Sequence, residues 1–227
     1  MSMPSSPEPV PESPVTGPRD PALEIEHGLA MRAAAERLGK EFTGIGAETI
    51  ESFLETSYEH FAAGARIPTF LPLMAERFSR QRLRALARVE GARDRPTVLF
   101  LCPDNAGRSL LALGLFEELA GDGAVAWSGG ADPATDVDAG VATAMGERGI
   151  DLADEFPKPW TDEIVEAADV VVTMGGVTAP ELPGRQYEHW DLPDPGGQDL
   201  DTVRAIRDES EQRVRDLLAR LGVGVKA

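Results

Sequence analysis

Residues 98–109 decide how this sequence folds, and they read Val98-Leu99-Phe100-Leu101-Cys102-Pro103-Asp104-Asn105-Ala106-Gly107-Arg108-Ser109. The first four residues are a continuous apolar, β-favouring run of the kind found in a buried parallel strand. The pattern from Ala106 to Ala120 then predicts a helix. A buried strand that leads through a short loop into a helix is typical of an α/β fold, in which ligands bind at the carboxyl ends of the strands.

The rest of the C-terminal half continues this alternation of strands and helices. Residues 124–128 and 170–173 are the next predicted strands. The predicted helices span residues 139–148, a segment that begins at Thr161, and residues 200–221. Strands that alternate with helices predict a doubly wound, open parallel sheet of about four strands, with helices on both faces.

The chain before residue 96 has a helical period instead. Three apolar stripes recur at helical spacing: Met31, Ala34, Leu38 and Phe42; Ile50, Leu54, Ser57 and Phe61; and Met74, Phe78, Ala85 or Leu86, and Val89. We therefore expect a small three-helix bundle at residues 22–92, followed by an α/β domain at residues 96–227. Residues 1–21 hold seven prolines and few large apolar side chains, which predicts a disordered tail.

Composition and charge exclude several classes of function. The chain has 22 basic and 39 acidic residues and a formal net charge of −17, so we expect no nucleic-acid partner. The single cysteine excludes an internal disulfide and a CxxC zinc site, and with only three histidines we expect no metal site. The sequence shows no signal-peptide pattern and no apolar stretch of about 18 residues, so we expect a cytoplasmic protein without a membrane partner.

Arginines gather on the third predicted helix and just after it: Arg77, Arg80, Arg82, Arg84, Arg88, Arg93 and Arg95. One interpretation is a docking surface for an anion or an acidic partner. The other, which we favour, is a solvated helix face that also contacts the acidic α/β domain of the same chain.

The position of the only cysteine suggests chemistry. Cys102 directly follows the first predicted strand, where the free N–H groups and the dipole of the next helix can bind an anion and lower the pKa of a thiol. Arg108 can close over that anion with a planar, two-pronged donor, and Ser109 can donate to the sulfur. Asn105 and Gly107 tolerate the backbone angles that a tight anion-binding loop requires.

With these residues, the stretch 97–221 resembles the low-molecular-weight protein-tyrosine-phosphatase superfamily and, within it, the arsenate reductases of arsenic resistance. VLFLCPDNAGRS is similar to the family's phosphate-binding loop. The likeness continues through GERGIDLADEFPKPWTDEIVEAADVVVTMG, YEHWDLPDPGGQ and DTVRAIRDESEQRVRDLL. The helical segment 22–90 resembles an N-terminal three-helix extension that some members carry.

The resemblance implies a role for each residue of the motif. Cys102 would be the nucleophile that attacks a small oxyanion, arsenate or phosphate. The oxyanion would be held by Pro103, Asp104, Asn105, Ala106, Gly107, Arg108 and Ser109. Asp194, in the pair Asp194-Pro195, would be the general acid that protonates the leaving oxygen, with Asp191 as a nearby alternative.

The sequence also departs from the family. Reductases that use thioredoxin carry two further cysteines, whereas the corresponding segment here, residues 174–181, has none. We therefore expect no bound cofactor and an external thiol, mycothiol or glutathione, as the reductant, with a glutaredoxin-like protein to regenerate it. Within the loop, Pro103 lacks an N–H donor, and Asp104 places a negative charge beside the anion site.

Two alternatives stay open at this point. The same residues would serve a phosphatase for aryl phosphates or phosphotyrosine, and an aromatic wall would favour that activity. The candidates for the wall are Trp127, Trp160, Tyr187 and Trp190. The altered loop would also suit a regulatory protein that binds an oxyanion without turning it over. The helical segment has no expected chemistry, and a homodimer formed through it is one open role.

Overall fold

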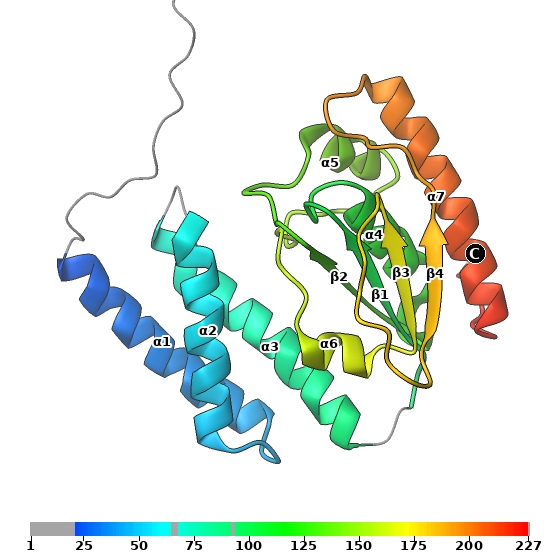
Figure 1. Cartoon of the computed structure of the whole chain (residues 1–227). Helices are drawn as coiled ribbons and strands as arrows, with labels where there is room; N and C mark the ends of the chain where they lie inside the picture. The colour runs from blue at the N-terminus through cyan, green and yellow to red at the C-terminus, as the bar shows by residue number, and fades with distance from the viewer. Residues whose placement is uncertain (1–20, 65–67, 92–93, 227) are drawn as a thin grey trace, which may run out of the picture.

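The computed structural model describes residues 21–64, 68–91 and 94–226, and it shows three N-terminal helices beside a parallel β-sheet (Figure 1). The helical part comprises α1 (Pro21–Glu41), α2 (Ala47–Gly64), the short 3₁₀ helix η1 (Pro68–Phe70) and α3 (Leu71–Glu90). The α/β part comprises β1 (Thr97–Cys102), α4 (Arg108–Ala120), η2 (Gly121–Gly123), β2 (Val125–Gly130), α5 (Ala139–Gly146), α6 (Asp162–Ala167), β3 (Val170–Met174), β4 (Gln186–Trp190) and α7 (Leu200–Arg220). Within the described residues, no helix is long and apolar enough to cross a membrane. The tail predicted at 1–21, except Pro21, lies outside the described residues.

The sheet confirms the predicted fold class. Its strand order is β2-β1-β3-β4, and all three neighbouring pairs are parallel. The central strand β1 ends at Cys102, which pairs with Gly130 of β2. Its other neighbour is β3, where Leu101 pairs with Thr173. The chain runs from β1 to β2 on one side and then crosses over to β3 on the other side, and this reversal creates a crevice at the carboxyl end of β1.

The last strand, β4, is the one that the sequence pattern did not locate. It lies at the edge of the sheet, and only Trp190 among its five residues is buried. An edge strand shows one side to water, so its side chains lack the continuous apolar run of the inner strands. Tyr187 anchors the segment, because its hydroxyl donates to the carbonyl of Pro180 and accepts from the N–H of Leu182.

Alternate residues of β1 point to opposite faces of the sheet. Val98 and Phe100 pack in one apolar cluster with residues of α4, α5 and α7. Leu99 and Leu101 pack in a second cluster with residues of α6 and, from the helical part, with Phe78 of α3. The helices that cover the second face therefore include α3, so the N-terminal helices and the sheet share one apolar core (Figure 1). The domain boundaries at 22–92 and 96–227 stay a prediction.

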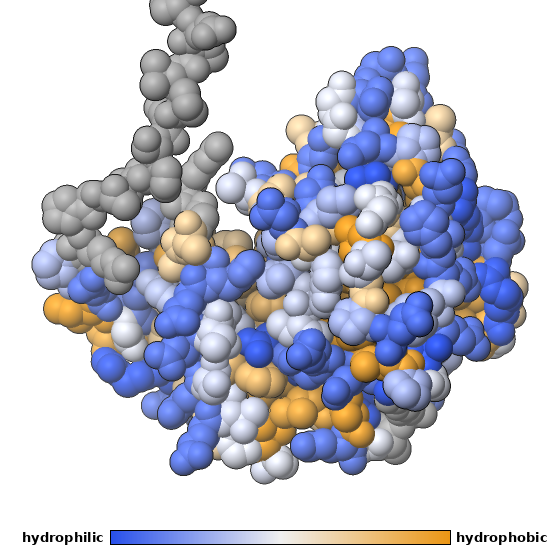
Figure 2. All heavy atoms as spheres, viewed as in Figure 1, coloured by the Kyte–Doolittle hydropathy of each residue, from blue (hydrophilic) through white to orange (hydrophobic). Residues whose placement is uncertain are grey.

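The apolar stripe of α3 ends earlier than its spacing predicts. Leu83 is fully buried between the helices, although the predicted stripe omitted it. Val89, which the stripe included, is exposed. Figure 2 shows a largely hydrophilic surface, with hydrophobic residues gathered over parts of the helical segment.

Three arginines of α3 contact the α/β part of the same chain, as the favoured interpretation predicts, whereas Arg80 and Arg84 pair with Glu41 of α1. Arg82 pairs with Glu163 of α6 at 2.5 Å, and Arg88 pairs with Asp169 at 2.7 Å. Arg77 pairs with Asp154 at 2.8 Å. The guanidinium of Arg82 also lies 4.0 Å from the ring centroid of Phe53. Arg93 lies outside the described residues.

Replacing Phe78 by alanine is expected to lower the free energy of unfolding of the whole chain by about 3–5 kcal/mol. Phe78 is 2% exposed and packs edge-on against Phe61, within the cluster that also holds Leu99. Unfolding in urea, followed by circular dichroism and by tryptophan fluorescence, measures the loss. All three tryptophans lie in the α/β part, so a fluorescence transition unaffected by the substitution would show that the two parts unfold separately.

Candidate active site

The backbone carbonyl groups of the loop between β1 and α4 accept hydrogen bonds that fix the loop in place. These carbonyls accept four backbone hydrogen bonds from the segment after β2: Ala131 to Cys102 at 3.4 Å, Asp132 to Pro103 at 2.8 Å, Ala134 to Asp104 at 2.9 Å, and Asp138 to Ala106 at 3.0 Å. Because the carbonyls turn outward, the loop can direct N–H groups inward, as an anion-binding loop requires. The loop contributes no N–H at Pro103.

Asn105 has the left-handed backbone that the sequence analysis expected of the loop. Its φ is +49°, and its side chain is fully buried. The side-chain amide donates to Ser109 Oγ at 2.8 Å, and its oxygen accepts the backbone N–H of Lys158 at 2.9 Å. Asn105 therefore ties the loop to α4 on one side and to the segment before α6 on the other.

Gly107 is required by its backbone angles and also by a close contact with a distant segment. Its φ of −121° and ψ of −94° lie outside the helical and the extended regions, in keeping with the expectation. A Cβ at this position would lie 2.7 Å from Cγ of Pro195. Gly107 is therefore also needed because Pro195 packs directly against the loop, which brings the segment that carries Asp194 to the site.

Cys102 is fully buried at the end of β1. Its sulfur lies 3.0 Å from Ser109 Oγ and 3.2 Å from Oδ1 of Asp104, which also accepts the N–H of Ala106 at 3.2 Å. Burial raises the pKa of the thiol above its ordinary value. The hydrogen bond with Ser109 lowers this pKa, and the nearby Asp104 raises it, so that the pKa stays raised. The expected lowering of this pKa is therefore wrong for this arrangement. The protonated thiol donates to the Asp104 carboxylate.

Replacing Asp104 by asparagine is expected to lower the pKa of Cys102. The change removes a negative charge beside the sulfur, so the thiolate forms more easily and its fraction at a fixed neutral pH rises. Alkylation by iodoacetamide should be at least about threefold faster at pH 7.5, and its pH dependence should move to lower pH. The measurement reports one residue, because Cys102 is the only cysteine. Asp122→Asn, a similar change in η2, is the control, and equal alkylation profiles for both variants would contradict the role of Asp104.

Arg108 and Asp194 meet at the mouth of this loop. Arg108 is buried in the first turn of α4, and its Nη2 donates to Oδ2 of Asp194 at 2.9 Å. Its guanidinium packs against Gly175, where a Cβ would lie 2.6 Å from Nη1. The carboxylate of Asp194 is half-exposed and also accepts the N–H of Gly196. An oxyanion in the loop would meet an arginine that is already oriented, with an acid beside it.

The other sequence candidates lie away from this arrangement. Asp191 is exposed, and its backbone carbonyl accepts a hydrogen bond from Arg213. Among the aromatic residues, Trp127, Trp160 and Tyr187 pack in the cluster shared with α3 and α6, and Trp190 packs against Phe100 on the opposite face. These core positions lend no support to an aromatic wall. The described residues include no group of three His, Cys, Asp or Glu side chains that could hold a metal ion.

Comparison with known proteins agrees with this geometry. Residues 97–227 match the model of the low molecular weight phosphotyrosine protein phosphatase family, and residues 31–87 match a protein-tyrosine-phosphatase-like N-terminal domain. A thioredoxin-dependent arsenate reductase of Corynebacterium glutamicum has a similar structure, with a TM-score of 0.77 and 37% identity, over 86% of this chain and 98% of that one. The glutaredoxin arsenate reductase of Synechocystis is 30% identical over 55% of this chain and 97% of its own length. Arsenate reductase 2 of Staphylococcus epidermidis is 30% identical over 56% of this chain and 99% of its own length.

The match to the family model covers more than half of the chain and includes the whole Cys102 loop and Asp194. The similarity to the Corynebacterium structure extends beyond the α/β part into the N-terminal helices. The chain therefore belongs to the low-molecular-weight phosphotyrosine protein phosphatase family of enzymes, and within that family it resembles the arsenate reductases.

Proposed function

We propose that this protein reduces arsenate to arsenite, with Cys102 as the nucleophile. The observation that carries the proposal is the contact of 2.9 Å between Arg108 and Asp194 beside the loop that holds the only cysteine. It supplies an anion-binding group and a proton donor next to one sulfur atom. The names of the relatives, three arsenate reductases, support arsenate as the oxyanion.

The first step joins sulfur to arsenic. The Cys102 thiolate attacks the arsenic atom and forms an S–As bond, while one hydroxyl of arsenate leaves as water with a proton from Asp194. Arg108 and the N–H groups of residues 104–109 hold the remaining oxygens. Arsenic keeps its oxidation state of +5 in this adduct, so the electrons must arrive in later steps.

Those electrons come from outside the chain, because Cys102 has no second cysteine to form a disulfide with. A first external thiol attacks the arsenic, and the new S–As bond displaces Cys102 as a thiol. A second thiol then attacks the sulfur of the first, which forms a disulfide and releases arsenite with the electron pair of the broken S–As bond. Two thiols are oxidised by two electrons, and arsenic is reduced by two. We propose mycothiol or glutathione as the first thiol and a glutaredoxin-like protein as the second.

Anaerobic assays of arsenite formation test this proposal. Arsenate is supplied with mycothiol or glutathione, each with its matching glutaredoxin-type protein, and in a third arm with thioredoxin and its reductase. Arsenite that requires a low-molecular-weight thiol supports the mechanism and identifies the thiol. Arsenite in the thioredoxin arm alone would contradict the external-thiol step. No arsenite from a folded protein would contradict the function itself.

A second candidate is the hydrolysis of aryl phosphates, which the family description favours. Cys102, Arg108 and Asp194 would then form a cysteinyl phosphate that water hydrolyses. A solved arsenate reductase in a phosphate binding state, 29% identical with a TM-score of 0.51, supports phosphate as an anion that such a loop accepts. Turnover of p-nitrophenyl phosphate without arsenite formation would favour this candidate. Phosphate binding with neither activity would favour a regulatory protein.

We also propose that the reaction takes place in the cytoplasm, where low-molecular-weight thiols stay reduced. A homodimer through the helical segment is proposed on the exposed apolar side chains of α1, Ile25 and Leu29, which are 65% and 57% exposed. Light scattering of the full chain tests the dimer, and a monomer mass at micromolar concentration would contradict it.

A further inference from the structure

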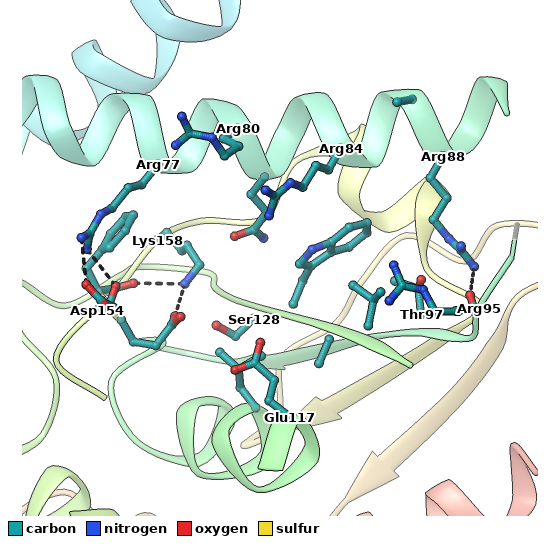
Figure 3. A pocket seen from close by; sticks show the side chains of 18 of the residues that line it. Arg77, Arg80, Arg84, Arg88, Arg95, Thr97, Glu117, Ser128, Asp154 and Lys158 are labelled. Carbon is teal, nitrogen blue, oxygen red and sulfur yellow. Dashed lines mark hydrogen bonds and ion pairs between the residues drawn. The ribbon is translucent and has the colours of Figure 1, made fainter. Parts of the chain in front are cut away.

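A cavity of about 840 Å³ lies apart from the catalytic loop, along the free edge of β2. Its walls come from α3 on one side and α4 on the other, with the segment 154–158 at one end (Figure 3). None of residues 102–109 lines it. The volume falls in the range of sites that bind small molecules.

Cationic side chains outnumber acidic ones in the lining of the cavity, and each of these cations has an ion-pair partner. The lining has six cationic residues, Arg77, Arg80, Arg84, Arg88, Arg95 and Lys158, against four acidic ones, Asp94, Glu117, Asp154 and Glu155. Arg84 is the cation most open to a ligand, since its side chain is 61% exposed. Among the described residues, its one ion pair is to Glu41 at 3.2 Å, and Arg80 already binds that carboxylate at 2.8 Å. Arg84 is therefore the cation of the lining that is best able to bind an added anion.

Several polar groups in the walls lack partners within the described chain. The buried atoms Ser128 Oγ, Thr97 Oγ1 and Gln81 Nε2 have no hydrogen bond, although buried polar atoms are normally paired. Ser128 and Thr97 are fully buried. Glu117 is exposed and extends from α4 toward the cavity, and it has no ion pair with the residues that the structure describes (Figure 3). Loss of hydration and the negative charge of Glu155 raise the pKa of Glu117 to about 7. The positive charge of Lys158 lowers this pKa, but by less.

The open part of the strand edge is short, which favours a small molecule over an added peptide strand. Val125 donates to Pro96 on the β1 side, so Ala126 and Ser128 direct their backbone groups to the free edge. Beyond them the edge is covered, because Gly130 donates to the carbonyl of Lys158 at 2.9 Å. Two residues of free edge offer too few hydrogen bonds for a peptide strand.

We propose that this cavity binds a small organic phosphate that carries hydroxyl groups, as sugar phosphates and mononucleotides do. Arginine is suited to phosphate because its planar donors match the phosphate oxygens, and Arg84 with the amide of Gln81 supplies such donors here. The carboxyl of Glu117 and the hydroxyl of Ser128 accept and donate hydrogen bonds to the ligand's hydroxyl groups, as acidic residues do with ribose in dinucleotide sites. The site is independent of the reaction proposed for Cys102.

Calorimetric titration of the full chain tests the proposal. The probes are glucose 6-phosphate and AMP. The controls are inorganic phosphate, which lacks the hydroxyl-bearing organic part, and glucose and adenosine, which lack the phosphate. The titrations are repeated in Arg108→Ala, which removes anion binding at the catalytic loop. At least one of the two organic phosphates should bind one to one, with a similar Kd in both proteins.

Two substitutions locate the site. Arg84→Gln should raise the Kd for the organic phosphate at least about tenfold. Glu117→Ala should raise that Kd by a similar factor and should leave the Kd for inorganic phosphate unchanged. The matched controls are Arg185→Gln and Glu118→Ala, which lie outside the cavity and should change neither Kd. Thermal melts establish that each variant is folded.

Three results would overturn the proposal. Binding that disappears in Arg108→Ala and survives Arg84→Gln would place the ligand on the catalytic loop. Inorganic phosphate that binds as tightly as the organic phosphates, with no effect of Glu117→Ala, would show an unspecific anion site. The absence of binding by both organic phosphates up to about 5 mM would show that the cavity takes neither.

Discussion

Changing Cys102 to serine is expected to lower the rate of arsenite formation at least about 10⁴-fold. The serine hydroxyl is a far weaker nucleophile than a thiolate, and no other cysteine in the chain can form the S–As bond. The assay is anaerobic arsenite formation with the thiol that supports the unmodified protein. Residual turnover above about 1% would contradict the role of Cys102 as nucleophile.

The loss of activity can be assigned to the nucleophile only if Cys102→Ser still folds and still binds an anion. Arg108 and the backbone of residues 104–109 are untouched, so Cys102→Ser should bind inorganic phosphate at the loop within about threefold of the unmodified affinity. The side chains of serine and cysteine differ little in volume, and Ser109 Oγ remains beside the new hydroxyl. Loss of phosphate binding together with activity would show instead that the loop had collapsed.

Replacing Asp194 by asparagine is expected to lower kcat for arsenite formation by about 10²- to 10⁴-fold. An amide cannot supply the proton that lets the hydroxyl of arsenate leave as water. The substitution also frees Arg108 from its ion pair at 2.9 Å, so the affinity for phosphate should be unchanged or higher. A large loss of kcat with retained anion affinity separates a proton donor from a residue that only shapes the site.

The chain supplies a matched control for this variant. Asp191 lies three residues earlier, is exposed, and contacts Arg213 only through its backbone carbonyl. Asp191→Asn makes the same chemical change on the same segment and should leave kcat within about twofold. Equal losses in the two variants would indicate a general effect of charge on this segment and would contradict the assignment of Asp194.

Local sequence was enough to locate three of the four strands and the loop that carries Cys102 and Arg108, whereas Asp194 was proposed from the family resemblance. An apolar run before Cys102 and a helical pattern after it locate the loop, and the Asp194-Pro195 pair marks the opposite segment. The structure places Arg108 in contact with Asp194. Their catalytic roles stay predictions, because the geometry shows proximity and not reaction.

What the sequence could not show depends on contacts between distant segments. The pKa of Cys102 follows from how deeply the sulfur is buried and from the direction of the Asp104 side chain, and neither is visible in a motif. Lys158 holds the loop through Asn105, 53 residues away, and no local pattern marks it. The stripe on α3 showed that one face is buried, but not that this face covers the sheet at Leu99.

The contact between Gly107 and Pro195 also constrains how this protein can evolve. A side chain at position 107 would collide with the proline ring, so a mutation there is tolerated only after position 195 has changed to a smaller residue. Across related sequences the two positions should therefore vary together, although 88 positions separate them along the chain. A library that randomises either position alone should return almost only the original glycine at 107, whereas one that randomises both should recover paired solutions.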